Sequence, residues 1–193
     1  MHWPRTLAAR GTQPLRREHL RGQDHNLLRA ALHCFVLDCS ASMLANGRLA
    51  LAKGVLAHLL QQVYVQREQA VVLGFSGQGT KLLQPPARAR PACTSQLAAP
   101  AWLASVAGGG GTPLADALAQ ADALLQRHSH RPRWLWLLSD GRSRAAPPRP
   151  AHAEHAYIID FDTARLPLQR CLQLAQVWQA EYMHIHTGWQ DSH

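Results

Sequence analysis

Three oxygen-bearing side chains stand at alternate positions directly after an apolar run. The run "LHCFVL" leads into Asp38, and Ser40 and Ser42 follow it. Carboxylate and hydroxyl oxygens suit hard cations such as Mg²⁺ and do not suit zinc, which takes nitrogen and sulfur ligands. The stretch therefore predicts one side of a divalent-cation site, whose remaining ligands must come from elsewhere in the chain.

Two further residues are candidates for those ligands. Thr112 stands in the glycine-rich stretch "AGGGGTPL", and Asp140 follows the apolar run "RWLWLLS". If the two apolar runs are parallel strands of one sheet, their carboxyl ends meet at the edge where such sheets bind ligands. The glycines before Thr112 would let its hydroxyl turn toward that edge. We predict that five residues hold one Mg²⁺ ion, with Mn²⁺ as the alternative metal: Asp38, Ser40, Ser42, Thr112 and Asp140.

The charge of this ligand set indicates binding and not catalysis. Hydroxyls as direct ligands, with carboxylates acting partly through water, leave the ion under-neutralised, so that it attracts one more carboxylate from outside. A haloacid-dehalogenase phosphatase would need a second aspartate where Ser40 stands. A serine hydrolase would need a G-x-S-x-G elbow, and the chain has none. We predict a docking point for an Asp or Glu of another protein.

The elements that must position these residues alternate between strand and helix. Apolar runs predict core strands, "TKLLQPP" predicts an edge strand that its prolines end, and three segments show helical spacing. We also expect a helix capped by Thr94 or Ser95 that runs to Trp102, and a helix with Thr112 as N-cap and Pro113 at its first position. The core-strand runs are "HCFVLD", "QAVVLGFSG", "RWLWLLSDG", "AYIIDFD" and "YMHIH"; the helical segments are "RLALAKGVLAHLLQQVYVQ", "LADALAQADALLQRH" and "PLQRCLQLAQVWQAE".

This alternation predicts an α/β fold. We expect one doubly wound, mainly parallel sheet of about six strands, with one antiparallel edge strand and helices on both faces. The domain would occupy residues 31–193, and residues 1–30 would form a basic arm that has no core of its own.

Composition limits the class of partner. Lys and Arg number 20 against 12 Asp and Glu, a formal net charge of +8, which favours anionic partners such as acidic protein segments or nucleic acid. The four cysteines form no CxxC pair, and Cys34 lies within an apolar run, which indicates reduced thiols. With no apolar leader stretch and no bilayer-spanning run in the sequence, we expect a cytoplasmic protein.

The order of the candidate ligands carries a family resemblance. Asp38-x-Ser40-x-Ser42, then Thr112, then Asp140-Gly141 resembles the metal-ion-dependent adhesion site of von Willebrand factor A domains. The stretches "DCSASM", "VVLGFSGQGTKLLQPPARA", "GGGGTPLADAL" and "LSDGR" are similar to the carboxyl-terminal A domain of the magnesium-chelatase D subunit and its cobaltochelatase relatives. The resemblance covers roughly Leu32 to His186. Ala41 departs from it, since the family usually has glycine there, but this position is not a ligand.

The resemblance implies a role for each candidate. Ser40, Ser42 and Thr112 would be hydroxyl ligands, while Asp38 and Asp140 would hold the metal directly or through water. The protein would be a non-catalytic accessory or scaffold subunit of a magnesium or cobalt chelatase, acting on tetrapyrroles. Its partner would be the AAA+ chelatase ATPase subunit or the large chelatase subunit.

The sequence departs from the D subunits upstream of the A domain. Those subunits carry an AAA-like ATPase module and an acidic, Pro-rich linker there, whereas "GGGGTPL" is not followed by Lys-Ser/Thr and no other phosphate loop occurs in these 193 residues. We therefore expect no ATP hydrolysis. We also expect Asp38→Ala to abolish Mg²⁺-dependent association and leave the fold intact, on the assumption that the site lies outside the core.

Two other functions are open at this point. Close histidine pairs, among them His184 and His186 on one strand face, could make the chain a carrier of cobalt or nickel for a chelatase. The arginines together with Trp3, Trp134 and Trp136 could instead bind nucleic acid, although both later tryptophans fall in a predicted core strand. A steep salt dependence of binding would favour a polyphosphate partner.

Overall fold

The computed structural model describes residues 30–88, 103, 106–110, 113–143, 146–164 and 168–185. Three predictions lie outside these residues: the basic arm, except for its last residue, the helix from Thr94 or Ser95 to Trp102, and the position of Thr112.

One mixed sheet forms the middle layer of the domain. Its six strands lie in the order β3-β2-β1-β4-β5-β6, with β3 antiparallel to β2 and every other neighbouring pair parallel. The predicted six-stranded, mainly parallel sheet with one antiparallel edge strand is therefore confirmed. The strands are β1 Leu32–Asp38, β2 Gln69–Ser76, β3 Gly79–Arg88, β4 Arg133–Ser139, β5 His155–Asp160 and β6 Glu181–His184.

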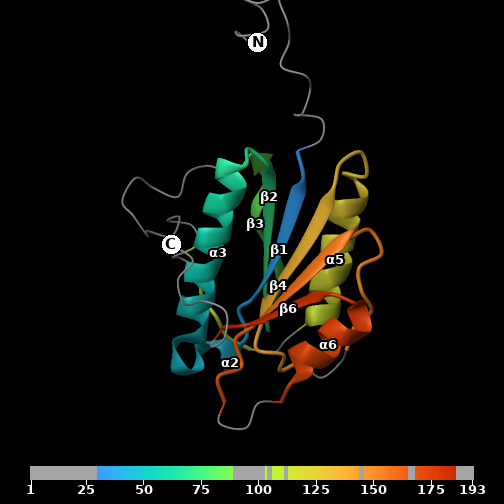
Figure 1. The fold of residues 1–193 in the computed structure, drawn as a ribbon. Coiled ribbons are helices and arrows are strands. Elements are labelled where there is room, and N and C mark those ends of the chain that lie inside the picture. The colour runs from blue at the N-terminus through green and yellow to red at the C-terminus, as the bar shows by residue number, and fades with distance from the viewer. Residues whose placement is uncertain are drawn as a thin grey trace, which may run out of the picture.

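Helices cover both faces of this sheet, as predicted (Figure 1). One face carries α3 and the opposite face carries α5 and α6, while the short α2 lies near the carboxyl ends of the strands. The described helices are α2 Ala41–Leu44, the 3-10 turn η3 Ala45–Gly47, α3 Arg48–Val65, α5 Leu114–Gln126 and α6 Arg170–Trp178.

The alternation of side chains along β1 divides the core into two layers. Phe35 and Leu37 pack with α3 residues such as Leu56, whereas Cys34 and Val36 pack with α5 and α6 residues such as Leu125 and Trp178. All seven residues of β1 are buried. A central parallel strand is covered on both faces, which explains why its sequence is almost entirely apolar before Asp38, with His33 as the one polar residue.

The predicted end of the edge strand is wrong. β3 continues through Pro85 and Pro86 to Arg88, although we expected the prolines to end it. Proline has no N–H to donate, but an edge strand needs donors on one side only. The pairing of β2 with β3 shifts register around Val72, opposite this proline segment, which accommodates it.

Two helix starts also differ from the predictions. Pro113 is the N-cap residue of α5, which begins at Leu114. The last helix begins at Arg170, although we expected it to include Leu168 and Gln169 as well, and it ends at Trp178. Gln169 and Gln179 flank it in the left-handed conformation, with φ of 54° and 52°, and so interrupt the helical backbone at both ends.

Candidate metal centre

Asp38 lies at the carboxyl end of β1 and is fully buried. The backbone N–H of Ser40 donates to Oδ1 (2.8 Å), and the hydroxyl of Ser139 donates to Oδ2 (2.6 Å). Burial is the main cause that raises the pKa of the Asp38 carboxyl, the charge of Asp140 adds to it, and the Ser139 and Ser40 hydrogen bonds partly offset it. Both oxygens are therefore held in fixed directions at the edge of the sheet.

This burial corrects one sequence-based expectation. Asp38→Ala was expected to leave the fold intact because the site would lie outside the core, but Asp38 has no exposed surface. Alanine would leave the Ser139 hydroxyl without its acceptor and would open a void beside it, at a cost of about 1–3 kcal/mol. Asn, which has the same shape and is not ionised, is the better substitution for separating charge from packing.

The two serines place their hydroxyls side by side. Ser40 Oγ and Ser42 Oγ lie 3.0 Å apart, so that one hydroxyl donates to the other. Adjacent ligands of an octahedral Mg²⁺, each about 2.1 Å from the ion, are separated by about 3 Å. The spacing of the two hydroxyls therefore fits two neighbouring positions around such an ion.

Asp140 directly follows β4, the strand that pairs with β1. It is buried, its Oδ1 accepts the Arg142 backbone N–H (3.2 Å), and its Oδ2 lies 3.3 Å from Arg48 Nη1. The same Nη1 donates to the Ser42 carbonyl oxygen (3.5 Å), so Arg48 links the loop after β1 to the loop after β4. The sheet thus brings Asp38, Ser40, Ser42 and Asp140 to one edge.

The glycine-rich loop is held against the end of β1. Gly109 N–H donates to the Cys39 carbonyl oxygen (2.8 Å), and Ala41 N–H donates to the Gly110 carbonyl oxygen (3.1 Å). Ala41 stands between the two candidate serines, so the described part of the loop reaches the site. Thr112, two residues farther along, is outside the described residues, and its role as a ligand stays a prediction.

The sequence-based reasoning missed three charged residues at this edge. Arg48 is 3% exposed, and besides Asp140 it faces Asp162, whose Oδ1 lies 3.8 Å from Nη2. Arg142 also approaches both carboxylates, at 3.6 and 3.8 Å. Two signals were present: "DFD" repeats an Asp-x-Asp pattern at a strand end, and an arginine at the first turn of a helix opposes the helix dipole unless acids compensate it.

The donor set of this edge fits a hard divalent ion. The groups that could hold one are carboxylate and hydroxyl oxygens. The two arginines neutralise mainly Asp140 and Asp162, whereas Asp38 accepts hydrogen bonds from the uncharged Ser40 N–H and Ser139 hydroxyl. Among the described residues, no three His, Cys, Asp or Glu side chains gather in a way that could hold a metal. A metal at this edge would therefore need the serine hydroxyls as well as the carboxylates, and this ligand set stays a prediction.

The histidines that the structure describes do not gather into a comparable site. His184 Nε2 donates to the Asp162 carbonyl oxygen (3.0 Å), and His152 Nδ1 lies 3.0 Å from the Asp122 carboxylate. His128 and His130 face each other with ring centroids 6.2 Å apart. His186 is outside the described residues. No described contact favours the carrier function over the docking function.

The comparisons with known proteins agree with this architecture. The family model of the von Willebrand factor type A domain matches residues 34–142, which include the Asp38 loop, the glycine-rich loop and Asp140. The chain belongs to the von Willebrand factor type A domain family. Among solved structures it is similar to BatB from Bacteroides thetaiotaomicron (TM-score 0.61, 16% identity, 81% of this chain and 90% of that one). It is also similar to the PilB minor pilin of Streptococcus sanguinis (TM-score 0.59, 12% identity, 86% and 58%).

Among curated sequences, this A domain is related to magnesium-chelatase subunits. It is 32% identical over 169 residues to the magnesium-chelatase 60 kDa subunit of Cereibacter sphaeroides, which covers 78% of this chain and 29% of that subunit. It is 42% identical over 91 residues to the magnesium-chelatase 67 kDa subunit of Heliobacterium mobile, which covers 47% and 13%. The chain thus spans less than a third of these relatives. Within the described residues, no helix combines the length and apolar character needed to span a bilayer.

Proposed function

We propose that this A domain is a non-catalytic docking module of a tetrapyrrole metal chelatase, and that it grips a carboxylate of a partner subunit through a bound Mg²⁺. The observation that carries the proposal is the convergence of the Asp38 loop and Asp140 on one edge of the sheet, with the Ser40 and Ser42 hydroxyls 3.0 Å apart. The relationship to magnesium-chelatase subunits supports the choice of system.

The candidate ligands have two different roles in this proposal. Ser40, Ser42 and Thr112 offer neutral hydroxyl oxygens, while Asp38 and Asp140 offer charge. When bound, Mg²⁺ supplies a positive charge with an open coordination position for an outside carboxylate. Because Arg48 and Arg142 already neutralise Asp140, the site as a whole stays electrophilic toward an acidic partner. Mn²⁺ would satisfy the same oxygen ligands.

The partner we propose is the AAA+ chelatase ATPase subunit or the large chelatase subunit, each supplying one Asp or Glu. The positive charge of the chain would speed their encounter, because an acidic surface is attracted over about one Debye length. The inserted metal, magnesium or cobalt, is cargo of the complex and is distinct from the docking ion.

Asp38→Asn tests the metal site. We expect wild-type protein to gain about 2.7 kcal/mol in free energy of unfolding at Mg²⁺ a hundredfold above its dissociation constant, and Asp38→Asn to gain none. Urea denaturation with Mg²⁺ and with EDTA measures both. Asp116→Asn, which removes an exposed acid from the first turn of α5, is the matched control and should respond like wild type. Equal Mg²⁺ stabilisation of Asp38→Asn and wild type would contradict the proposed ligand set.

The docking step has its own test. The chain, immobilised, should retain purified chelatase ATPase or large subunit in Mg²⁺ and release it in EDTA. Retention that is insensitive to EDTA and to Asp38→Asn would show that the contact does not pass through the ion.

A further inference from the structure

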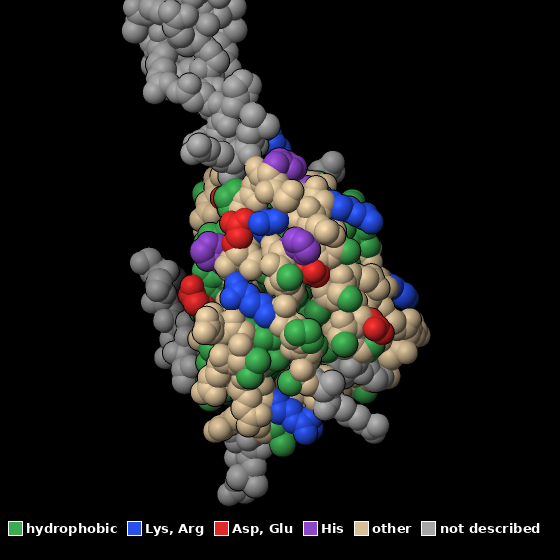
Figure 2. Space-filling view, turned by 90° about the vertical axis from the view of Figure 1, so that its right-hand side faces the viewer, with side chains coloured by type: hydrophobic (Ala, Val, Ile, Leu, Met, Phe, Trp, Pro, Cys, Tyr) green, Lys and Arg blue, Asp and Glu red, His purple; other side chains and the backbone are tan. Residues whose placement is uncertain are grey.

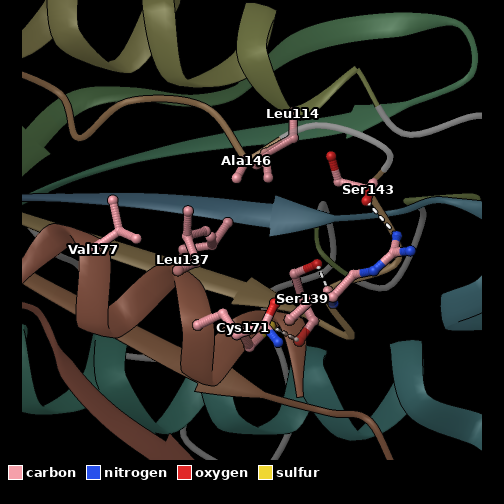
Figure 3. A pocket seen from close by; sticks show the side chains of 11 residues that line it. Leu114, Leu137, Ser139, Ser143, Ala146, Cys171 and Val177 are labelled. Carbon is pink, nitrogen blue, oxygen red and sulfur yellow. Dashed lines mark hydrogen bonds between the residues drawn. The ribbon is translucent and has the colours of Figure 1, made fainter. Parts of the chain in front are cut away.

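A pocket of about 340 Å³ opens beside the metal-binding edge, between α5, β4 and α6. Figure 3 shows that Leu137 and Val177 lie at one end of it and that Ser139 and Ser143 lie at the other. Its volume is near the lower limit of ligand pockets, about 300–1,000 Å³, which suits one or two side chains better than a large cofactor.

The described part of the crossover from β4 to β5 brings no helix to this face, which leaves room for the pocket. The described residues of that crossover, 140–143 and 146–154, are irregular or turn. In a doubly wound sheet a helix normally covers each crossover, whereas the described part of residues 140–154 leaves the space between α5 and α6 partly uncovered. Apolar side chains gather in the lower half of this face, with a basic group beneath them (Figure 2).

The deeper part of the pocket is apolar. Leu114, Leu137 and Leu174 line it, and the first two come from the start of α5 and from β4. Val177 stands at its rim with 73% of its surface exposed, the largest exposed fraction among the large hydrophobic residues described. Apolar surface that stays in contact with water is unfavourable. An apolar occupant that covers this floor and rim would therefore bind favourably.

The polar end of the pocket is shared with the metal centre. The Ser139 hydroxyl donates to Asp38 Oδ2 (2.6 Å) and accepts the Gly141 N–H (3.0 Å), and both Ser139 and Gly141 line the pocket. Arg170, an exposed residue of the lining, is anchored there because its Nη1 donates to the Ser143 carbonyl oxygen (2.7 Å). Arg142, whose half-exposed side chain lies 3.6 Å from Asp140 Oδ2, stands in the chain between Gly141 and Ser143 of the lining. An occupant would therefore meet positive charge at one end and apolar surface at the other.

We propose that this pocket is a second anchor for the docking partner: it takes one bulky apolar side chain, such as leucine, of the same acidic segment whose carboxylate is gripped at the metal centre. The inference rests on the proposed docking function and specifies its partner as an acidic peptide segment with a leucine-like residue a few positions from the metal-binding Asp or Glu. Arg170 in the lining, and Arg142 beside Asp140, complement the charge of that segment.

Synthetic peptides separate the two anchors. The probe is a glycine-based peptide with one aspartate and, a few residues away, one leucine; its partners replace leucine by serine or aspartate by asparagine. Methyl NMR titration of the full chain, with saturating Mg²⁺ and with EDTA, measures the dissociation constants. We expect the leucine peptide to bind about tenfold tighter than the serine peptide, and its addition to shift the methyl signals of Leu174 and Val177.

A matched pair of variants tests the location. Val177→Asp places a carboxylate at the rim of the pocket, whereas Val65→Asp places one at the end of α3 on the opposite face, at a residue that is 64% exposed. Both sites are exposed, so both variants should fold. Val177→Asp should erase the tenfold preference for the leucine peptide, and Val65→Asp should keep it.

The outcomes distinguish the two proposals. Equal affinity for the leucine and serine peptides, or equal behaviour of the two variants, overturns the pocket inference and leaves carboxylate docking in place. Equal affinity for the aspartate and asparagine peptides in Mg²⁺ overturns the docking proposal itself, and the inference falls with it.

Discussion

Arg48 is the residue on which the charges of the candidate site converge. Its guanidinium faces Asp140 and Asp162 and also donates from Nε to the Thr163 hydroxyl (3.1 Å). Two buried carboxylates without a cation would be costly, and the nearby Arg142 is half-exposed, whereas Arg48 is buried. Arg48 therefore stabilises the site in the absence of any bound ion.

Replacement of Arg48 should show this cost. Arg48→Met keeps the length of the side chain and removes the charge, and we expect it to lower the free energy of unfolding by about 3 kcal/mol, as for other broken buried pairs. The control is Arg133→Met, which breaks an exposed pair with Glu154 and should cost at most about 1 kcal/mol. Urea denaturation of both variants measures the difference, and equal costs would show that Arg48 is not a structural counter-ion.

His33 is a second buried polar residue, at the opposite end of β1. Trp136 Nε1 donates to its Nδ1 (3.1 Å), and its Nε2 donates to Glu68 Oε2 (2.6 Å), so the neutral ring has one defined tautomer. Burial lowers the pKa of His33 below 6.5, and the hydrogen bond and charge of Glu68 offset part of that shift. The folded protein thus resists protonation that the unfolded chain accepts.

This difference predicts a pH dependence of stability. Below about pH 6.5 the unfolded state binds more protons at His33 than the folded state does, so the free energy of unfolding should fall as the pH drops. His33→Gln, which can accept from Trp136 and donate to Glu68 without titrating, should remove this contribution. Denaturation curves between neutral and mildly acidic pH measure it, and an unchanged slope in His33→Gln would assign the effect to other groups.

At the scale of elements, the glycine-rich loop depends on a close approach to the turn between β2 and β3. Gly110 has φ +76°, and a Cβ there would lie 2.5 Å from Gly77 Cα, a backbone atom that cannot move alone. Gly77 N–H also donates to the Gly109 carbonyl oxygen (2.9 Å). The loop that leads to Thr112 is therefore positioned by the β2–β3 hairpin as well as by β1.

Two glycine-to-alanine substitutions should change the free energy of unfolding in opposite directions. Gly110→Ala puts a residue with a Cβ into the left-handed conformation and makes that Cβ clash with the backbone of Gly77. We therefore expect it to lower the free energy of unfolding by about 2 kcal/mol and to weaken Mg²⁺ binding. Gly54→Ala lies in the exposed middle of α3 with nothing near its Cβ, and it should raise stability by about 0.5–1 kcal/mol. Thermal and urea unfolding give both values. A harmless Gly110→Ala would mean that the loop can shift away from the hairpin.

At the scale of the whole molecule, the sheet order explains why distant segments form one site. β1 and β4 are neighbours in the sheet although helices and two strands separate them in the chain. Parallel neighbours end at the same edge, which brings the loops after them together. The pocket lies on the α5 and α6 side of that edge, so one partner segment could contact both features.

We expect the purified chain not to hydrolyse ATP, because its 193 residues contain no phosphate-binding loop. A coupled phosphate-release assay with and without Mg²⁺ measures this. Sustained ATP hydrolysis that stays with the chain through purification, and that Asp38→Asn lowers, would refute the non-catalytic role.

The sequence alone determined the features that depend on local order. Apolar runs predicted the central strands, helical spacing predicted α3 and α5, and polar residues at strand ends placed Asp38, Ser40, Ser42 and Asp140 at one edge of the sheet, where their role as metal ligands stays a prediction. These signals are local because each kind of burial leaves its own pattern in the sequence. A strand buried on both faces gives a continuous apolar run, and a helix buried on one face gives apolar residues at helical spacing.

Only the tertiary structure decided which distant groups compensate one another and which surfaces stay uncovered. Arg48 and Asp140 are 92 residues apart, and nothing in either neighbourhood encodes their contact. The full burial of Asp38, the continuation of β3 through its prolines and the open pocket beside α6 likewise follow from how whole elements pack. Packing excludes water and sets the partner of each buried charge, and it is a property of the assembled layers.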